Sequence, residues 1–151
     1  MYMKEKILRV IKYIVLFLIG GAAYFGIEIL WRGYSHWTMF LLGGLCFVIV
    51  GALNNWLPWE MNIEKQALIG SGVITILELI MGIIVNLILG LGVWDYSMIP
   101  LNILGQICLP YSILWIFLAA AIILVDDWVR YKVFKEEKPR YSFWIKEMMK
   151  E

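Results

Sequence analysis

Residues 67–91 read ALIGSGVITILELIMGIIVNLILGL, a run of twenty-five residues in which Glu78 is the only charged side chain. A helix of this length extends about 37 Å at about 1.5 Å per residue, which exceeds the roughly 30 Å hydrocarbon core of a bilayer. Because hydrocarbon offers no water, the backbone of such a segment must satisfy its own hydrogen bonds. The run therefore predicts a transmembrane helix.

Three further apolar runs are long enough to cross a membrane, at residues 10–31, 37–57 and 107–125. The whole chain is 62% hydrophobic and has a mean hydropathy of +0.80, values above those of an ordinary soluble domain. We therefore expect an all-α polytopic membrane bundle of four transmembrane helices within residues 1–127. Residues 128–151 are expected to form a cytoplasmic basic and aromatic tail at the membrane interface.

The basic residues are distributed unevenly about the four runs. Twelve of the thirteen lysines and arginines fall on one side if all four runs cross, and only Arg32 falls on the other. Because loops rich in lysine and arginine stay in the cytoplasm, this bias predicts cytoplasmic N- and C-termini.

The first and third runs resemble one another when the sequence is shifted by fifty residues. Ile19-Gly20 then aligns with Ile69-Gly70, and Glu28 aligns with Glu78. Two hairpins in the same orientation would have a pseudo-twofold axis along the membrane normal. The alternative is coincidence, since apolar helices align easily with each other. The repeat favours retention of the first run as a helix over its removal as a signal peptide.

Polar and small residues in the third run are spaced by three or four. They are Ser71, Thr75, Glu78, Gly82 and Asn86. This spacing places them on one helical face, which must point away from lipid. The face either makes polar contacts between packed helices or lines a pathway, and the glutamate near mid-depth favours the pathway.

Two other acidic residues have a basic residue one helical turn away. Glu28 shares a face with Tyr24 and precedes Arg32 by four residues, so it forms either a local ion pair or a substrate-facing carboxylate tuned by Arg32. Asp126 precedes Arg130 by four residues near the end of the fourth run, and we expect a structural ion pair there.

The sequence lacks the common motifs of soluble catalysis. It contains no GxxxxGK[ST] segment, so an ATP-driven step would require a separate ATPase, and it contains no HExxH, GxSxG or Cys/His cluster. We expect no catalytic residue, metal ligand, cofactor or nucleic-acid partner. An enzyme that acts on lipid ranks third among the functional alternatives.

Four segments together resemble a known family. They are Glu28-Ile29-Leu30-Trp31-Arg32-Gly33-Tyr34-Ser35-His36-Trp37, Gly43-Gly44, Trp94-Asp95-Tyr96-Ser97 and Gly105-Gln106-Ile107-Cys108-Leu109-Pro110-Tyr111-Ser112. This pattern is similar to that of small bacterial membrane proteins labelled "putative ABC-transporter type IV", or permease. The resemblance covers roughly residues 15–130 and implies a bacterial plasma-membrane location, with Glu28 and the Gln106 region among the family-like positions.

The favoured hypothesis is a small membrane transporter or permease-like subunit that moves a cation or a protonatable small solute. We expect a homo-oligomer in contact with membrane lipid, with an ATPase or another membrane-complex subunit as a further partner. The predicted carboxylate-lined route comprises Glu78, Ser71, Thr75, Asn86, Glu28, Tyr24, Arg32, Gln106 and Asn102. The alternative is a non-transporting scaffold or regulatory subunit of a membrane complex, in which the polar face is a contact surface.

Overall fold

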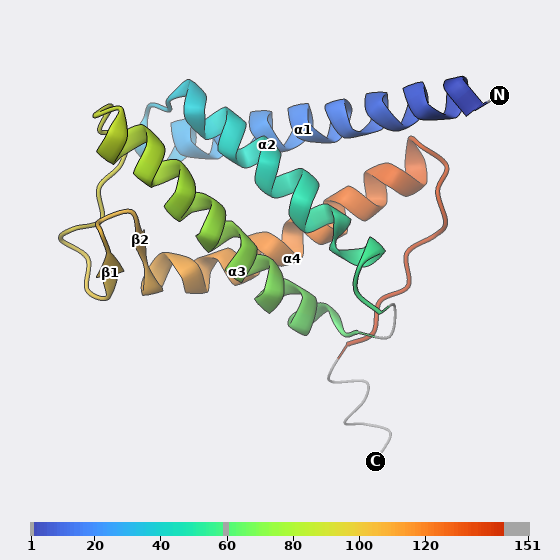
Figure 1. Ribbon diagram of the computed structural model, residues 1–151. Coiled ribbons are helices and arrows are strands. Elements are labelled where there is room, and N and C mark those ends of the chain that lie inside the picture. The colour runs from blue at the N-terminus through green and yellow to red at the C-terminus, as the bar shows by residue number, and fades with distance from the viewer. Residues whose placement is uncertain (1, 59–60, 144–151) are drawn as a thin grey trace, which may run out of the picture.

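The computed structural model describes residues 2–58 and 61–143 of the chain. Its main elements are four helices, α1 (Tyr2–Arg32), α2 (Trp37–Gly51), α3 (Ile63–Gly82) and α4 (Leu109–Lys132) (Figure 1). A 3₁₀ turn, η1 (Ala52–Asn55), extends α2, and a π-helix, η2 (Ile83–Ile88), extends α3. Between α3 and α4, strands β1 (Asn102–Ile103) and β2 (Ile107–Cys108) form an antiparallel hairpin in which Asn102 is opposite Cys108.

The all-α prediction is confirmed, because four helical segments are long and apolar enough to cross a membrane. The helix ends differ from the predicted runs. α1 begins at Tyr2, α3 begins at Ile63, and α4 begins at Leu109 and continues to Lys132. α3 begins early because the Asn62 side chain accepts a hydrogen bond from the Lys65 amide at 3.2 Å and caps the helix.

The predicted fourth run starts two residues too early, since Ile107 and Cys108 belong to β2. Pro110 lies in the first turn of α4, where its missing amide hydrogen costs no helical hydrogen bond. The first five residues of the predicted tail, 128–132, continue α4. The last eight residues of that tail, 144–151, lie outside the described residues.

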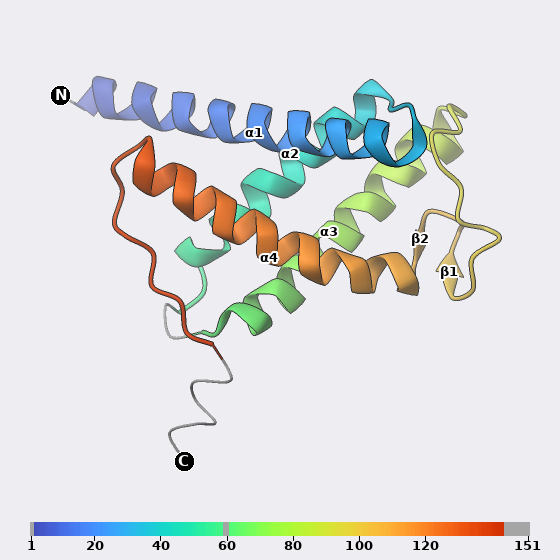
Figure 2. The same cartoon turned by 180° about the vertical axis from the view of Figure 1, so that it is seen from behind.

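The helices pack as two hairpins, α1 with α2 and α3 with α4 (Figures 1 and 2). Glycines allow α1 and α2 to approach closely. A methyl group added at Gly43 would lie 3.0 Å from the Gly20 carbonyl oxygen and would also meet the Tyr24 side chain. Close backbone approach at small residues is the usual way in which helices associate in membranes, where the hydrophobic effect does not drive helices together.

The interior and the outer surface of the bundle are both apolar. Leu16, Val50, Ala119 and Ile123 are fully buried at its centre, whereas large apolar side chains such as Leu30 (89% exposed) cover its outside. An outer surface of this kind fits a lipid solvent. Together with the four spanning-length helices, it identifies a multi-pass membrane protein.

The N-terminal half of α1, the end of α2 and the chain beyond α4 meet at one end of the bundle. Lys12 of α1 forms an ion pair with Glu136 beyond α4, and Asn54 of η1 donates to both carboxylate oxygens of Asp127 at 2.7 and 2.9 Å. Figure 2 shows the beginning of α1 and the end of α4 at the same end. Four membrane crossings, an even number, place the beginning of α1 and the end of α4 on the same side of the membrane.

Candidate functional site

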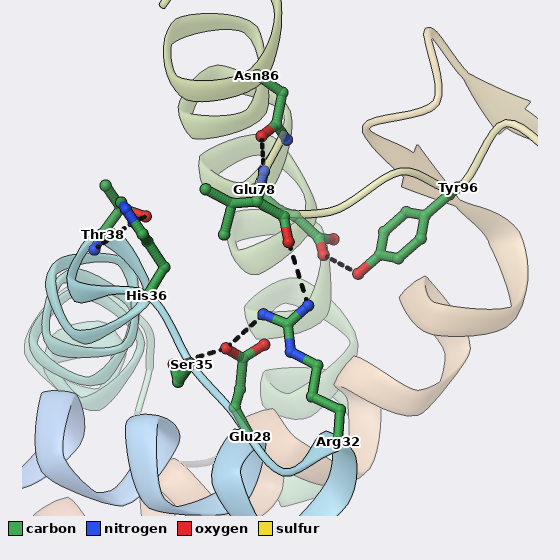
Figure 3. A network of polar contacts seen from close by, with 9 residues as sticks. Glu28, Arg32, Ser35, His36, Thr38, Glu78, Asn86 and Tyr96 are labelled. Atoms are coloured by element: carbon green, nitrogen blue, oxygen red, sulfur yellow. Dashed lines mark hydrogen bonds and ion pairs between the residues drawn. The ribbon is translucent and has the colours of Figure 1, made fainter. Parts of the chain in front are cut away.

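Glu78 lies in the last third of α3, four residues before Gly82, and is 2% exposed. The Tyr96 hydroxyl donates a hydrogen bond to Oε1 at 2.9 Å, and the Trp115 indole nitrogen donates to Oε2 at 2.9 Å. Tyr96 comes from the loop before β1, as Figure 3 shows, and Trp115 comes from α4 (Figure 3). The carboxylate is therefore held by two donors from different parts of the chain.

Both donors to Glu78 are neutral groups. In the described part of the chain, the ion pairs join other acids to their bases: Lys12 to Glu136, Arg32 to Glu28, and Arg130 to Asp126 and Glu136. A buried charge without an opposite charge is costly even when it is hydrogen-bonded. Glu78 therefore provides a position where a proton or an external cation would be favoured.

An apolar cavity of about 220 Å³ lies against Glu78. All four helices contribute to its wall, which includes Tyr24, Cys46, Ile74 and Trp115. Glu78 is the only charged residue among those that line it. The cavity thus combines an almost wholly hydrophobic wall with one carboxylate.

A second cavity, of about 520 Å³, adjoins the first. The two share Tyr24, Ile27, Trp115 and Leu118 as wall residues. The charged residues in the wall of the second cavity are Glu28 and Arg32. The two membrane glutamates therefore lie at the walls of neighbouring cavities, with Tyr24 and Trp115 between them.

Glu28 has a local ion pair and also faces a cavity. Arg32 Nη2 lies 2.8 Å from Glu28 Oε2, and the Ser35 hydroxyl donates to the same oxygen at 2.8 Å (Figure 3). Arg32 Nη1 in turn donates to the Val93 carbonyl at 3.2 Å, which ties α1 to the loop after α3. The two interpretations that the sequence left open for Glu28 are therefore not exclusive.

The rest of the polar face of α3 is engaged in packing. Ser71 Oγ donates to the Ser112 carbonyl at 2.6 Å, and Thr75 Oγ1 donates to Ser112 Oγ at 3.0 Å. Asn86 donates to Gln106 Oε1 at 2.8 Å and accepts from the Val93 amide at 2.7 Å. None of Ser71, Thr75 and Asn86 is a wall residue of either cavity. These three side chains make the polar contacts between packed segments that the sequence offered as the alternative to a lined pathway.

Asn102 and Gln106, predicted at the entrance of a route, make hydrogen bonds within the loop between α3 and α4. Asn102 donates to the Ile99 carbonyl at 2.8 Å and accepts from the Gly105 amide at 3.1 Å. Gln106 is 3% exposed, and neither residue lines the two cavities. Gly105 has φ +67°, a left-handed conformation that glycine adopts without strain and that closes this turn.

The protonation state of Tyr96 follows from its surroundings. Burial, and then the nearby charge of Glu78, raise the pKa of the Tyr96 phenol above its ordinary value. The phenol therefore keeps its proton at physiological pH and remains a hydrogen-bond donor to Glu78.

Asp126 and Arg130 form a separate polar site at the end of α4. Arg130 Nε lies 2.5 Å from Asp126 Oδ2, and both side chains are buried. Next to this ion pair, Asp127 accepts from Asn54 and from the Tyr141 hydroxyl at 2.9 Å. None of these residues lines the cavities near Glu78, so this network fixes the end of the bundle.

Sequence reasoning did not include Tyr96 and Trp115 in the site. Trp115 shares a helical face with Ser112 and Ala119, and this spacing was the available signal. Tyr96 lies in an irregular loop, where no periodicity predicts the direction of a side chain. In the described ranges, no group of three or more His, Cys, Asp or Glu residues is placed to hold a metal ion.

Comparison with known proteins identifies a family. A family model described as "Putative ABC-transporter type IV" matches residues 15–147, a range that begins within α1 and extends beyond α4. No curated protein and no solved structure matches the chain.

Proposed function

The chain belongs to the family described as "Putative ABC-transporter type IV", and on this premise we propose that it is a membrane transport subunit for a cation or a protonatable small solute. The observation that carries the proposal is Glu78, a buried carboxylate with two neutral donors at the wall of an apolar cavity. A group of this kind inside a membrane protein marks a substrate or ion site by default, because burial without a function would be costly.

The hydrogen bonds of Glu78 suggest how it exchanges a proton or a cation. The Trp115 indole can only donate, whereas the Tyr96 hydroxyl can donate or accept. When Glu78 takes up a proton on Oε1, the hydroxyl of Tyr96 can turn and accept a hydrogen bond from the new O–H group. Trp115 continues to donate to Oε2. Tyr96 lines the second cavity. In the proposed cycle, the solute or proton reaches Glu78 from that cavity.

The proposal includes an assembly around this chain. The four helices surround the smaller cavity, and the larger one adjoins it. In the proposal, further copies or another subunit complete the route across the membrane. We place the assembly in a bacterial plasma membrane, in contact with lipid and with both termini in the cytoplasm. Energy from ATP would come from a separate ATPase.

Proton uptake into liposomes tests the proposal. Purified full-length protein is reconstituted with a pH-sensitive dye inside the vesicles, and a potassium diffusion potential, negative inside, is imposed. We expect the wild type to acidify the lumen and Glu78→Gln to reduce the rate to that of empty vesicles. Glu5→Gln is the matched control, because Glu5 is exposed in the first turn of α1, and it should retain the wild-type rate.

Two results would contradict the proposal. Uptake by Glu78→Gln at the wild-type rate would show that Glu78 is not needed for proton transport. A wild-type rate equal to that of empty vesicles would contradict proton transport by this chain on its own.

A scaffold or regulatory subunit is the second candidate, and the packing role of Ser71, Thr75 and Asn86 favours it. In that case no flux exists to be lost. Glu78→Gln would instead weaken co-purification with a membrane partner, because the variant would loosen the packing between α3 and α4.

A further inference from the structure

The larger of the two cavities is mainly aromatic. More than half of its wall residues are aromatic, and they come from α1, the loop after α3, and α4. Apart from Phe117, they are Tyr24, Trp31, Trp94, Tyr96, Tyr111 and Trp115. The cavity volume of about 520 Å³ falls in the range of pockets that hold small organic ligands.

The aromatic rings are held in place by their contacts with each other. Tyr96 stacks on Tyr111 with ring centroids 4.8 Å apart, and Tyr111 lies 5.8 Å from Trp115. Trp115 meets Tyr24 edge-on at 6.4 Å. The hydrogen bonds from Tyr96 and Trp115 to Glu78 fix two of these rings further, so the rings of the wall brace one another.

The charge around the two cavities is negative. Their charged wall residues are Glu28, Arg32 and Glu78. Arg32 compensates Glu28 through the ion pair at 2.8 Å, which leaves the charge of Glu78. The surroundings therefore complement one positive charge.

An inorganic cation does not suit this wall. Hard cations such as Ca²⁺ take six to eight oxygen ligands, and Mg²⁺ keeps its waters in a near-octahedral shell. The wall offers few oxygens and much apolar surface. A cation whose charge is spread over an organic group would instead be attracted to the aromatic faces and would lose little hydration.

We infer that the aromatic cavity between α1 and α4 binds an organic monocation of the quaternary ammonium class, attracted by its aromatic wall and by the charge of Glu78. This inference rests on the proposed transport function in that it names the class of solute. The binding step itself needs no transport and can be measured alone.

Binding is measured with purified full-length protein and radiolabelled tetraphenylphosphonium in a scintillation proximity assay. Benzyltrimethylammonium and neopentylbenzene, its neutral isostere with carbon in place of nitrogen, are used as competitors. We expect the ammonium compound to displace the label at a concentration at least about tenfold lower than the neutral isostere, as expected when a desolvated cation–π contact and one carboxylate favour the charged ligand.

Matched variants of Tyr111 separate the aromatic effect from packing. Tyr111→Phe retains the ring and should bind the cation as the wild type does. Tyr111→Leu retains apolar bulk but removes the ring, and should weaken cation binding about 5- to 30-fold with little change for the neutral isostere. If Tyr111→Leu fails to fold, Trp31→Leu and Trp31→Phe serve as a second pair, because Trp31 is 83% exposed at the cavity wall and its loss disturbs little packing.

Equal displacement by the ammonium compound and by the neutral isostere would overturn the inference, since the cavity would then be an apolar hole for any chain, a lipid tail included. Equal binding by the leucine and phenylalanine variants would also overturn it. Preferential cation binding without any vesicle flux would support the inference while contradicting transport. Proton flux without preference for the cation would support transport while contradicting the binding inference.

Discussion

At the scale of single residues, the main question is how a carboxylate persists inside an apolar bundle. Glu78 does so with two hydrogen bonds from neutral groups, and each of them has a length of 2.9 Å. Hydrogen bonds to a charged group contribute about 1.5–3 kcal/mol each, which is too little to offset the full cost of isolating a charge. The pair thus holds Glu78 in place while leaving it receptive to a proton or a cation.

Removing the Tyr96 hydroxyl should test this arrangement. Tyr96→Phe retains the ring stacked on Tyr111 but leaves Glu78 Oε1 without its donor, so we expect a loss of about 1.5–3 kcal/mol in the free energy of unfolding. The measurement is unfolding in mixed detergent micelles, followed by circular dichroism.

The matched control is Tyr96→Phe in a Glu78→Gln background. There the lost bond joins neutral groups, so the cost should fall to about 0.5–1.5 kcal/mol. An equal cost in both backgrounds would mean that the charge of Glu78 plays no part in the contact.

At the scale of elements, close packing of glycines decides how the helices pair. α1 and α2 approach at Gly20 and Gly43, and α3 approaches the loop before α4 at Gly82, where Gln106 and Trp94 fill the space. The π-helix Ile83–Ile88 widens the end of α3 and presents Asn86 to Gln106 and to the Val93 amide. These contacts fix the loop between α3 and α4, and that loop positions Tyr96.

Two glycine substitutions should separate packing from helix propensity. Gly43→Ala places a methyl group against the Gly20 backbone and Tyr24, neither of which can move freely, and we expect a loss of about 1–3 kcal/mol. Gly26→Ala is the control, because nothing lies within 4 Å of an added methyl group there.

Gly26→Ala should leave stability unchanged or raise it slightly, since alanine favours helix. Both values come from unfolding in the same micelles. Similar stabilities for Gly43→Ala and Gly26→Ala would show that α1 and α2 tolerate a wider separation.

At the scale of the whole molecule, ion pairs and hydrogen bonds hold the segments at one end of the bundle together, and the other end contains the aromatic cavity. The first of these ends joins Lys12 to Glu136 and Asp126 to Arg130, and the Ser142 carbonyl accepts from the Ile63 amide at 3.1 Å. These contacts connect the beginning of α3 with the chain beyond α4. The aromatic cavity, whose wall includes Trp94 and Tyr96 of the loop after α3, adjoins the opposite, predicted external, half of the molecule.

The orientation in the membrane can be measured by cysteine labelling. In a Cys46→Ala, Cys108→Ala background, Met98→Cys places a thiol on a loop residue that is 94% exposed, and Glu137→Cys places one beyond α4. With a membrane-impermeant maleimide and intact cells, we expect reaction at position 98 alone, and reaction at position 137 only after permeabilisation. The reverse pattern would contradict the predicted cytoplasmic termini.

The sequence by itself determined the four helices, because length and hydropathy are local properties that a bilayer selects directly. It also placed Glu78 on an inward face, since lipid penalises a charge wherever the rest of the fold lies. The prediction of the helix ends was less accurate, because caps such as Asn62 and the short hairpin before α4 depend on contacts between residues that the local pattern does not show.

Only the tertiary structure decided which partners meet Glu78. Tyr96 and Trp115 are eighteen and thirty-seven residues away along the chain, and the first of them lies in a loop without periodicity. The tertiary structure also assigned Ser71, Thr75 and Asn86 to packing rather than to a cavity wall. The physical reason is that a helical face fixes a direction, whereas the group it meets depends on how distant segments come together in three dimensions.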